Sequence, residues 1–250
     1  MELIFIRHGK TQGNRSGRYV GRTDEPILPE SREEIISRKM KNEYPSADIV
    51  FTSPMLRCIE TAHIIYPNQK LIVIPEFREC DFGEFEMKSY EELNGRKDYQ
   101  AWIDGGGKDP FPGGESMDTV RRRSMRGFYR AMEMAFRESD FTTESPDGAF
   151  GLMADSMVSG ADPVRENISR GSACMTERSF TGTASAIFPD DVPGGFPGTA
   201  PVMGPADSVA FVVHGGTIMS ILSVIGGGEF YDFQIENGKC VTFSIEPSLM

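Results

Sequence analysis

Short apolar runs that alternate with helical patterns constrain the fold of this chain more than any other feature. Four such runs, rich in β-branched residues, lie at 3–6, 49–52, 71–74 and 209–213. Apolar runs of this length without polar alternation are typical of strands that are buried on both faces of a sheet. The alternation predicts an α/β fold, a three-layer α/β/α sandwich with a mostly parallel central sheet.

Cap and turn signals place the predicted helices. Pro29 and the pair Ser53-Pro54 are expected to begin two of them, because serine is a good N-cap and proline is favoured in the first turn. A longer helix is predicted from about 115 to 136, where apolar residues recur at helical spacing. A fourth follows His214 and ends at the glycine run 226–228. The helix that begins at Pro29 is expected to bury Ile35, Ile36 and Met40.

Residues 139–207 break this pattern. Gly, Ser, Thr, Pro, Ala, Asp and Met dominate the segment, and no hydrophobic period is sustained. A loop of this length is unusual in a compact domain, so a lid or an appended module is an alternative. We expect a single domain over 1–250 that carries 139–207 as an insertion of low internal order.

The charge balance and the cysteines exclude several kinds of partner. The formal net charge is −11, so the overall field does not attract nucleic acid or an anionic membrane. No apolar run approaches the ~18 residues of a bilayer span, and no signal-peptide pattern is present. We expect a cytoplasmic protein with reduced thiols and no metal, because zinc-site and disulfide spacing is lacking among Cys58, Cys80, Cys174 and Cys240.

Basic residues and histidines stand where the predicted strands end. Arg7 and His8 directly follow the run 3–6, and His214 follows the run 209–213. Ligands of parallel sheets bind beyond the carboxyl ends of the strands. Arg57 is expected in the first turn of the helix after Ser53-Pro54, where the helix dipole also favours an anion. These positions indicate a site for a phosphate.

Four short motifs along the chain carry a family resemblance. They read Arg-His-Gly-Lys-Thr at 7–11, Ser-Pro-Met-Leu-Arg at 53–57, Glu-Cys-Asp-Phe-Gly at 79–83 and Val-His-Gly-Gly at 213–216. In this order they resemble the histidine phosphatase superfamily, the branch that also contains the cofactor-dependent phosphoglycerate mutases. The resemblance covers 1 to about 138 and about 208 to 246. It implies a phosphoglycerate mutase-like fold and phosphoryl transfer without a metal or cofactor.

The resemblance also implies a role for each motif residue. His8 would be the nucleophile that forms a phosphohistidine, and Glu79 would protonate the leaving group and then activate water. Arg7, Arg57 and His214 would act with them and hold the phosphoryl oxygens. Further phosphate contacts are expected from Asn14, Gly21, Thr23 and Gly215.

Residues 83–115 bear on the substrate. Aromatic residues stand there among glycines and prolines, and we expect them to cap the pocket and form one of its walls: Phe85, Tyr90, Tyr99, Trp102 and Phe111. The stretch is similar to bacterial α-ribazole phosphatases. This similarity implies a phosphomonoester hydrolase that acts on a small-molecule phosphate such as α-ribazole 5′-phosphate.

Two other functions stay open at this point. The first is a cofactor-dependent phosphoglycerate mutase, although 87–90 reads Met-Lys-Ser-Tyr where the mutases carry an arginine-rich segment. The second is a phosphate-binding scaffold without turnover, which would have no need of the acid Glu79. The products formed from a phosphomonoester distinguish all three.

Overall fold

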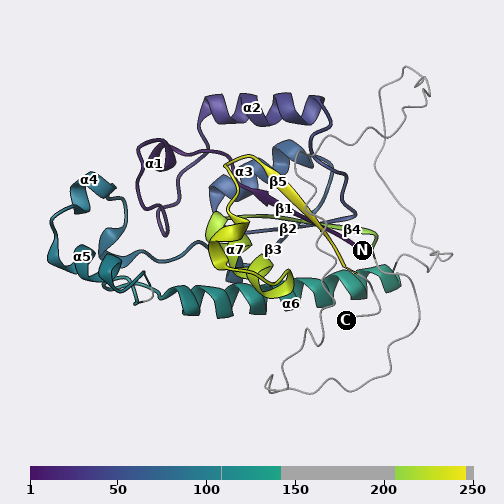
Figure 1. The fold of residues 1–250 in the computed structure, drawn as a ribbon. Coiled ribbons are helices and arrows are strands. Elements are labelled where there is room, and N and C mark those ends of the chain that lie inside the picture. The colour runs from purple at the N-terminus through teal and green to yellow at the C-terminus, as the bar shows by residue number, and fades with distance from the viewer. Residues whose placement is uncertain (108, 142–205, 246–250) are drawn as a thin grey trace, which may run out of the picture.

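A central five-stranded sheet organises the part of the chain that the computed structural model describes, residues 1–107, 109–141 and 206–245 (Figure 1). Its strands lie in the order β3-β2-β4-β1-β5. Three neighbouring pairs are parallel, and only β1 and β5 pair antiparallel. The bounds are β1 (Glu2–Arg7), β2 (Ile49–Thr52), β3 (Leu71–Val73), β4 (Ser208–Val213) and β5 (Cys240–Ser244).

The sheet confirms the predicted strands and adds one. Each of the four apolar runs forms a strand, and three of the four pairings are parallel. β5 was not predicted. It is an edge strand whose residues are partly exposed, and Thr242 and Ser244 interrupt its apolar residues, so it lacks the continuous apolar run of a strand that is covered on both faces.

Helices connect the strands and cover both faces of the sheet. Their bounds are α1 (Gln12–Arg15), α2 (Pro29–Met40), α3 (Leu56–Ile65), α4 (Tyr90–Leu93), α5 (Lys97–Asp104), α6 (Met117–Phe141) and α7 (Gly215–Ile225). Short 3₁₀ turns are η1 (Pro75–Phe77), η2 (Gly83–Phe85) and η3 (Phe230–Phe233).

Alternating side chains of the strands form a core on each face. Leu3 and Phe5 of β1 point to the side of α6 and α7, whereas Ile4 and Ile6 point to the side of α2 and α3. All four side chains are fully buried. Burial of these side chains between sheet and helices is the main stabilising contribution to the fold. The three-layer α/β/α prediction is therefore confirmed, and Figure 1 shows α2 and α6 on opposite sides of the sheet.

Two helices differ in detail from the prediction. α3 begins at Leu56 rather than at Ser53-Pro54, with Met55 as its N-cap residue. α2 buries Ile35, but Ile36 and Met40 are 42% and 80% exposed, so their predicted burial was wrong. The reason is that α2 contacts the sheet only along a narrow stripe, and the next residue in the sequence already lies beside that stripe.

The segment 82–111 forms a small cap with a core of its own. Phe85, Tyr99 and Phe111 are at most 5% exposed and pack with Val120 of α6. Their rings contact one another, with centroids 5.2 Å apart for Phe85 and Tyr99. Most of the predicted aromatic wall is therefore the interior of the cap. Figure 1 places α4 and α5 beside the end of α6 at which that helix begins.

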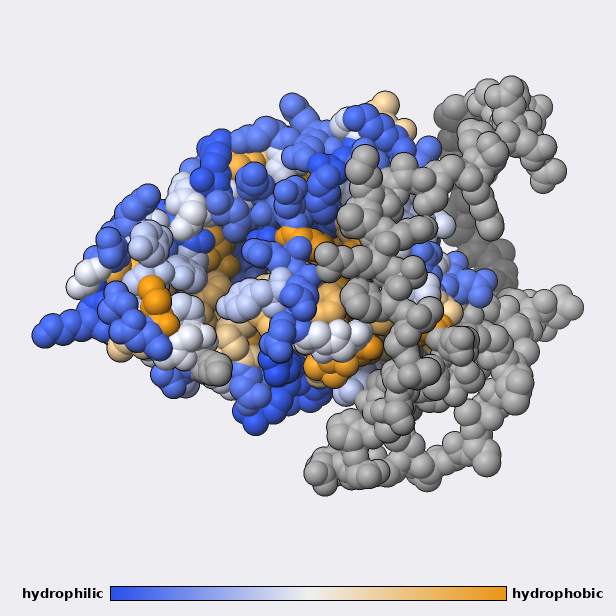
Figure 2. Space-filling model, in the orientation of Figure 1, coloured by the Kyte–Doolittle hydropathy of each residue, from blue (hydrophilic) through white to orange (hydrophobic). Residues whose placement is uncertain are grey.

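The predicted insertion at 139–207 lies largely outside the described residues. α6 extends to Phe141, and β4 begins at Ser208. In the described part of the chain, no helix has both the length and the apolar character to cross a membrane. On the face shown in Figure 2, hydrophilic residues predominate and apolar surface is confined to small areas.

Candidate active site

His8 and His214 occupy equivalent positions at the carboxyl ends of two neighbouring strands, β1 and β4. β1 and β4 are parallel neighbours in which Arg7 pairs with Val213, and each histidine is the next residue along its strand. The His8 amide donates to the Val213 carbonyl oxygen at 3.0 Å. The ring centroids of the two histidines lie 5.1 Å apart. The structure thus brings together the two histidines that the motifs predicted.

The surroundings of His8 keep its imidazole neutral. The residue is 3% exposed, and Nδ1 lies 2.7 Å from the Gly9 carbonyl oxygen. Since a carbonyl oxygen can only accept, Nδ1 carries the proton and Nε2 keeps its lone pair. Burial lowers the pKa of His8 well below its ordinary value, and the charges of Arg57 and Arg7 lower it further. A neutral imidazole with a free Nε2 is a nucleophile at pH 7.

Two arginines beside the histidines have donors left for an anion. Arg7 donates from Nη1 to the Ile235 carbonyl oxygen at 2.7 Å. Arg57, which is 1% exposed, donates to carbonyl oxygens of Thr23 at 2.9 Å and Gly21 at 3.1 Å. In the described structure, the Nε of each arginine is buried without a hydrogen-bond partner. Buried polar groups are normally paired, so these two N–H groups suit an anionic ligand.

Glu86 organises the loop that holds Arg57. Its Oε1 accepts from the amides of Gly21 at 3.0 Å and Thr23 at 2.8 Å. A Cβ at Gly21 would lie 2.0 Å from the Cys80 carbonyl oxygen, so only glycine fits there. The backbone amides and carbonyls of Gly21 and Thr23 are therefore occupied by Glu86 and Arg57. Direct contact of these residues with a phosphate stays a prediction.

Glu79 lies close to His214 and is held by its own backbone turn. Its Oε1 accepts from the Cys80 amide at 2.9 Å, and its Oε2 is 3.8 Å from His214 Nδ1. Burial raises the pKa of Glu79 above its ordinary value, and the nearby Arg57 and Arg7 charges offset only part of that rise. A carboxyl with a raised pKa is suited to donate a proton.

His214 is fixed by a hydroxyl at its other ring nitrogen. The residue is fully buried, and its Nε2 lies 2.8 Å from Ser53 Oγ. Burial lowers the pKa of His214 well below its ordinary value, and the Arg57 charge adds to this effect. His214 also precedes α7, whose first residue, Gly215, has no side chain; a Cβ there would lie 3.2 Å from Arg7 Cζ. Gly215 thus leaves room for the Arg7 guanidinium.

Asn14 is oriented by two hydrogen bonds to its side-chain oxygen. Its Oδ1 accepts from the Thr11 amide at 3.3 Å and from Asn237 Nδ2 at 3.4 Å. Asn237 also donates to the His8 carbonyl oxygen at 3.1 Å. With Oδ1 engaged, the amide nitrogen of Asn14 is the group that can donate to a ligand.

Four supporting residues were missed from the sequence. Ser53 was interpreted only as a helix cap, and Glu86 was assigned no role. Asn237 precedes a glycine with φ of +71°, and this Asn-Gly pair could have marked a turn beside the site. Arg123 is a buried charge on the apolar face of α6, a pattern that predicts a buried ion pair.

These contacts define an α/β protein with a candidate site, built around two histidines, at the carboxyl ends of its parallel strands. A family model described as histidine phosphatase superfamily (branch 1) matches residues 3–139, and the chain belongs to this family. The match includes four of the five predicted catalytic residues, and His214 lies beyond it.

Named relatives include phosphatases and 2,3-bisphosphoglycerate-dependent phosphoglycerate mutases, such as the mutase of Nautilia profundicola, to which the chain is 23% identical over 253 residues. The chain is 30% identical over 134 residues to phosphoserine phosphatase 1 of Hydrogenobacter thermophilus, which covers 51% of this chain and 62% of that protein. It is 33% identical over 106 residues to the adenosylcobalamin/alpha-ribazole phosphatase of Escherichia coli, and this match covers 41% of this chain and 52% of that protein. The chain thus spans between about half and three fifths of the length of these two phosphatases.

A solved structure shares the whole fold. The crystal structure of the alpha-ribazole phosphatase from Shigella flexneri superposes with a TM-score of 0.66 at 18% sequence identity, covering 100% of this chain and 93% of that one. At this identity the likeness supports the fold alone.

Proposed function

We propose that this protein hydrolyses phosphomonoesters of small molecules through a phosphohistidine at His8. One observation carries the proposal: a buried, neutral imidazole lies next to the guanidinium groups of the buried Arg57 and the partly buried Arg7, whose buried Nε atoms lack partners in the described structure. A phosphoryl group bound there would satisfy both Nε donors. Phosphoryl transfer needs chiefly a positioned nucleophile and charge stabilisation, and this arrangement supplies both.

In the first half-reaction, His8 Nε2 attacks phosphorus and the bond from phosphorus to the alcohol oxygen breaks. Arg7, Arg57 and His214 stabilise the charge on the phosphoryl oxygens as the bond to the leaving group lengthens. Glu79, whose raised pKa favours the protonated form, transfers its proton to the departing oxygen. The alcohol leaves, and Glu79 remains as a carboxylate.

In the second half-reaction, water attacks the phosphorus of phosphohistidine. The Glu79 carboxylate takes a proton from that water, the phosphorus–nitrogen bond breaks, and inorganic phosphate leaves. His8 returns to the neutral form with its proton on Nδ1, where the Gly9 carbonyl oxygen accepts it. The cycle closes with no net change in the protein.

The leaving-group side bears on the substrate class. Arg22 lies in the loop between Gly21 and Thr23, and its Nε is 3.2 Å from Asp81 Oδ1. A substrate with a carboxylate, such as a phosphoglycerate, would have to displace this ion pair to reach Arg22. We propose a substrate whose alcohol carries no carboxylate. α-Ribazole 5′-phosphate is the first compound to test, because a relative that is 33% identical over 106 residues is named for it.

Product analysis tests this proposal. The protein is incubated with α-ribazole 5′-phosphate, phosphoserine, 3-phosphoglycerate with a bisphosphate primer, and p-nitrophenyl phosphate, all with EDTA. We expect release of inorganic phosphate that EDTA does not reduce, with α-ribazole 5′-phosphate preferred over the two carboxylate-bearing substrates. Interconversion of phosphoglycerates would indicate a mutase, and binding without turnover would indicate a scaffold.

The pH dependence of kcat/KM is expected to be bell-shaped. His8 must be neutral, so the rate falls as pH drops through the lowered pKa of His8. Glu79 must be protonated, so the rate falls as pH rises through the raised pKa of Glu79. The acid limb is expected below the ordinary histidine value of about 6.5 and the alkaline limb above the ordinary glutamate value of about 4.3. Both limbs report macroscopic pKa values, because the ionisable groups of the site interact.

The measurement uses p-nitrophenyl phosphate with correction for the second ionisation of its phosphate. A rate that does not fall as pH rises to about 9 would contradict the role of Glu79, and a rate that does not fall down to the lowest pH at which the protein stays folded would contradict the role of His8.

A further inference from the structure

A buried ion pair adjoins Glu79 and has no part in the reaction proposed above. Arg123 of α6 is 4% exposed, and the Glu115 side chain is 13% exposed. Arg123 donates from Nε to Oε1 of Glu115 at 3.1 Å and from Nη2 to Oε2 at 2.8 Å. This two-point contact fixes the plane of the guanidinium group.

The other donors of Arg123 converge on the backbone that carries Glu79. Nη1 donates to the carbonyl oxygens of Glu76 and Arg78, both at 2.7 Å. Nη2 also contacts the Glu79 carbonyl oxygen at 3.4 Å. Three carbonyls from four consecutive residues are thus held by one side chain.

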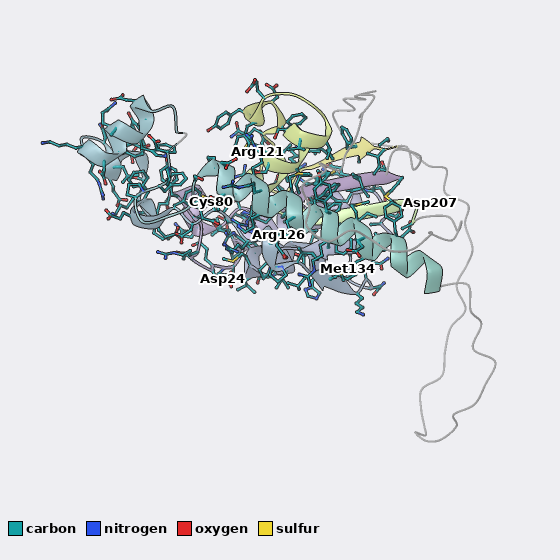
Figure 3. The ribbon with its side chains drawn as sticks, turned by 90° about the horizontal axis from the view of Figure 1, so that it is seen from below. Asp24, Cys80, Arg121, Arg126, Met134 and Asp207 are labelled. Atoms are coloured by element: carbon teal, nitrogen blue, oxygen red, sulfur yellow. The ribbon has the colours of Figure 1, made fainter. Side chains whose placement is uncertain are left out.

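Glu115 holds the same backbone from the other side of Glu79. Its Oε2 accepts from the Asp81 amide at 3.0 Å. α6 also approaches closely at Gly127, where a Cβ would lie 2.8 Å from the Cβ of Glu76. The long, packed helix therefore fixes the ion pair relative to the sheet. Cys80, the neighbour of Glu79, lies beside the first turns of α6 in Figure 3.

We infer that Arg123, together with Glu115, is a positioning residue for the carboxyl of Glu79. Residues 78–82 have no helical or strand hydrogen bonding of their own, so contacts from outside must define the path of this backbone. A general acid works only within hydrogen-bond reach of the atom it protonates, so a displaced backbone would weaken proton transfer. The inference rests on the proposed function. It adds that α6 must hold Arg123 in place for Glu79 to act as the acid.

The dependence of rate on the leaving group tests this inference. p-Nitrophenolate leaves readily without a proton, whereas phenolate needs the acid more. For Arg123→Met we expect kcat/KM on phenyl phosphate to fall about tenfold, part of the ~10²–10⁴-fold that a general acid supplies, with a change within about twofold on p-nitrophenyl phosphate. Arg123→Lys keeps the charge beside Glu115 but lacks the planar fork, so its effect should have the same direction.

Arg126→Met is the matched control, because Arg126 is exposed on the same helix (Figure 3) and should leave both rates unchanged. An equal fall on both substrates, or no fall on either, would overturn the inference. If thermal unfolding shows that Arg123→Met does not fold, the kcat/KM values of Arg123→Lys on the two substrates test the inference by the same criterion. A wild-type protein that turns over no aryl phosphate contradicts the proposed function itself, whereas an unchanged ratio in the variants of an active protein contradicts only the role of Arg123.

Discussion

Replacement of His8 by alanine is expected to reduce the rate of phosphate release by about 10⁴-fold or more, the size of effect typical of losing the nucleophile of a covalent mechanism. The remaining groups can still bind the phosphate, since Arg7 and Arg57 do not depend on the imidazole for their contacts. We therefore expect KM to change far less than kcat. Steady-state kinetics on p-nitrophenyl phosphate measures both constants.

The chain contains its own control for this replacement. It has three histidines, and His63 is exposed on α3, with Nδ1 3.0 Å from the Ile59 carbonyl oxygen of the same helix. His63→Ala should retain full activity. Thermal unfolding of both variants separates loss of chemistry from loss of fold. A folded His8→Ala protein that keeps more than about a tenth of the wild-type rate would exclude His8 as the nucleophile.

Replacement of Glu79 by glutamine is expected to have the second largest effect, and the effect should depend on the leaving group. Glutamine keeps the shape of the side chain but cannot donate the acidic proton. We expect kcat/KM on phenyl phosphate to fall about 10³-fold, within the range of general-acid contributions, and that on p-nitrophenyl phosphate to fall much less. The alkaline limb of the pH profile should disappear in the variant, because the group that titrates there is gone.

Glu84→Gln is the control for this replacement. Glu84 lies five residues further along, its side chain is 63% exposed, and it pairs with Arg96. An exposed ion pair of this kind contributes little to the free energy of unfolding, so the variant should match the wild type in stability and activity. Retention of the alkaline limb in Glu79→Gln would move the acid role to another group, with Asp81 as the nearest carboxyl in the sequence.

The sheet and the main site residues could be predicted from the sequence because their signals are local. A strand that is buried on both faces must be apolar throughout, so β1, β2 and β4 are visible as runs. β3 lies at one edge of the sheet and is partly exposed, but all its residues are apolar, so it is visible as a run too. His8 and His214 follow such runs directly, and strand pairing then brings them together. β5, at the opposite edge, shows no such signal because Thr242 and Ser244 interrupt its apolar residues.

The supporting contacts could not be predicted because they join distant parts of the chain. Glu86 bonds amides in the loop that begins at Gly21, and Asn237 bonds the carbonyl of His8. The sequence does not reveal which backbone groups a polar side chain will meet. Ser53 shows the same limit: helix-start rules favoured a cap, but its hydroxyl pairs with His214, and α3 begins later.

The cap illustrates a different limit. Its aromatic residues were expected to line the pocket, yet Phe85 and Phe111 are buried inside the cap. A cap that projects from the sheet needs a hydrophobic core of its own, and composition alone cannot distinguish core aromatics from lining aromatics. The cap region meets the loop beside Arg57 through Glu86, whose Oε1 accepts from the amides of Gly21 and Thr23.

Trapping of the phosphoenzyme tests the central claim most directly. Wild-type, Glu79→Gln and His8→Ala proteins are mixed with ³²P-labelled p-nitrophenyl phosphate, whose leaving group needs no acid, and quenched in alkali, which preserves phosphohistidine. Labelled peptides are identified by mass spectrometry. We predict label on the peptide that contains His8, more of it in Glu79→Gln because that variant lacks the base for hydrolysis, and none in His8→Ala. Turnover by the wild type without label on His8 in either active protein would contradict a phosphohistidine at this residue.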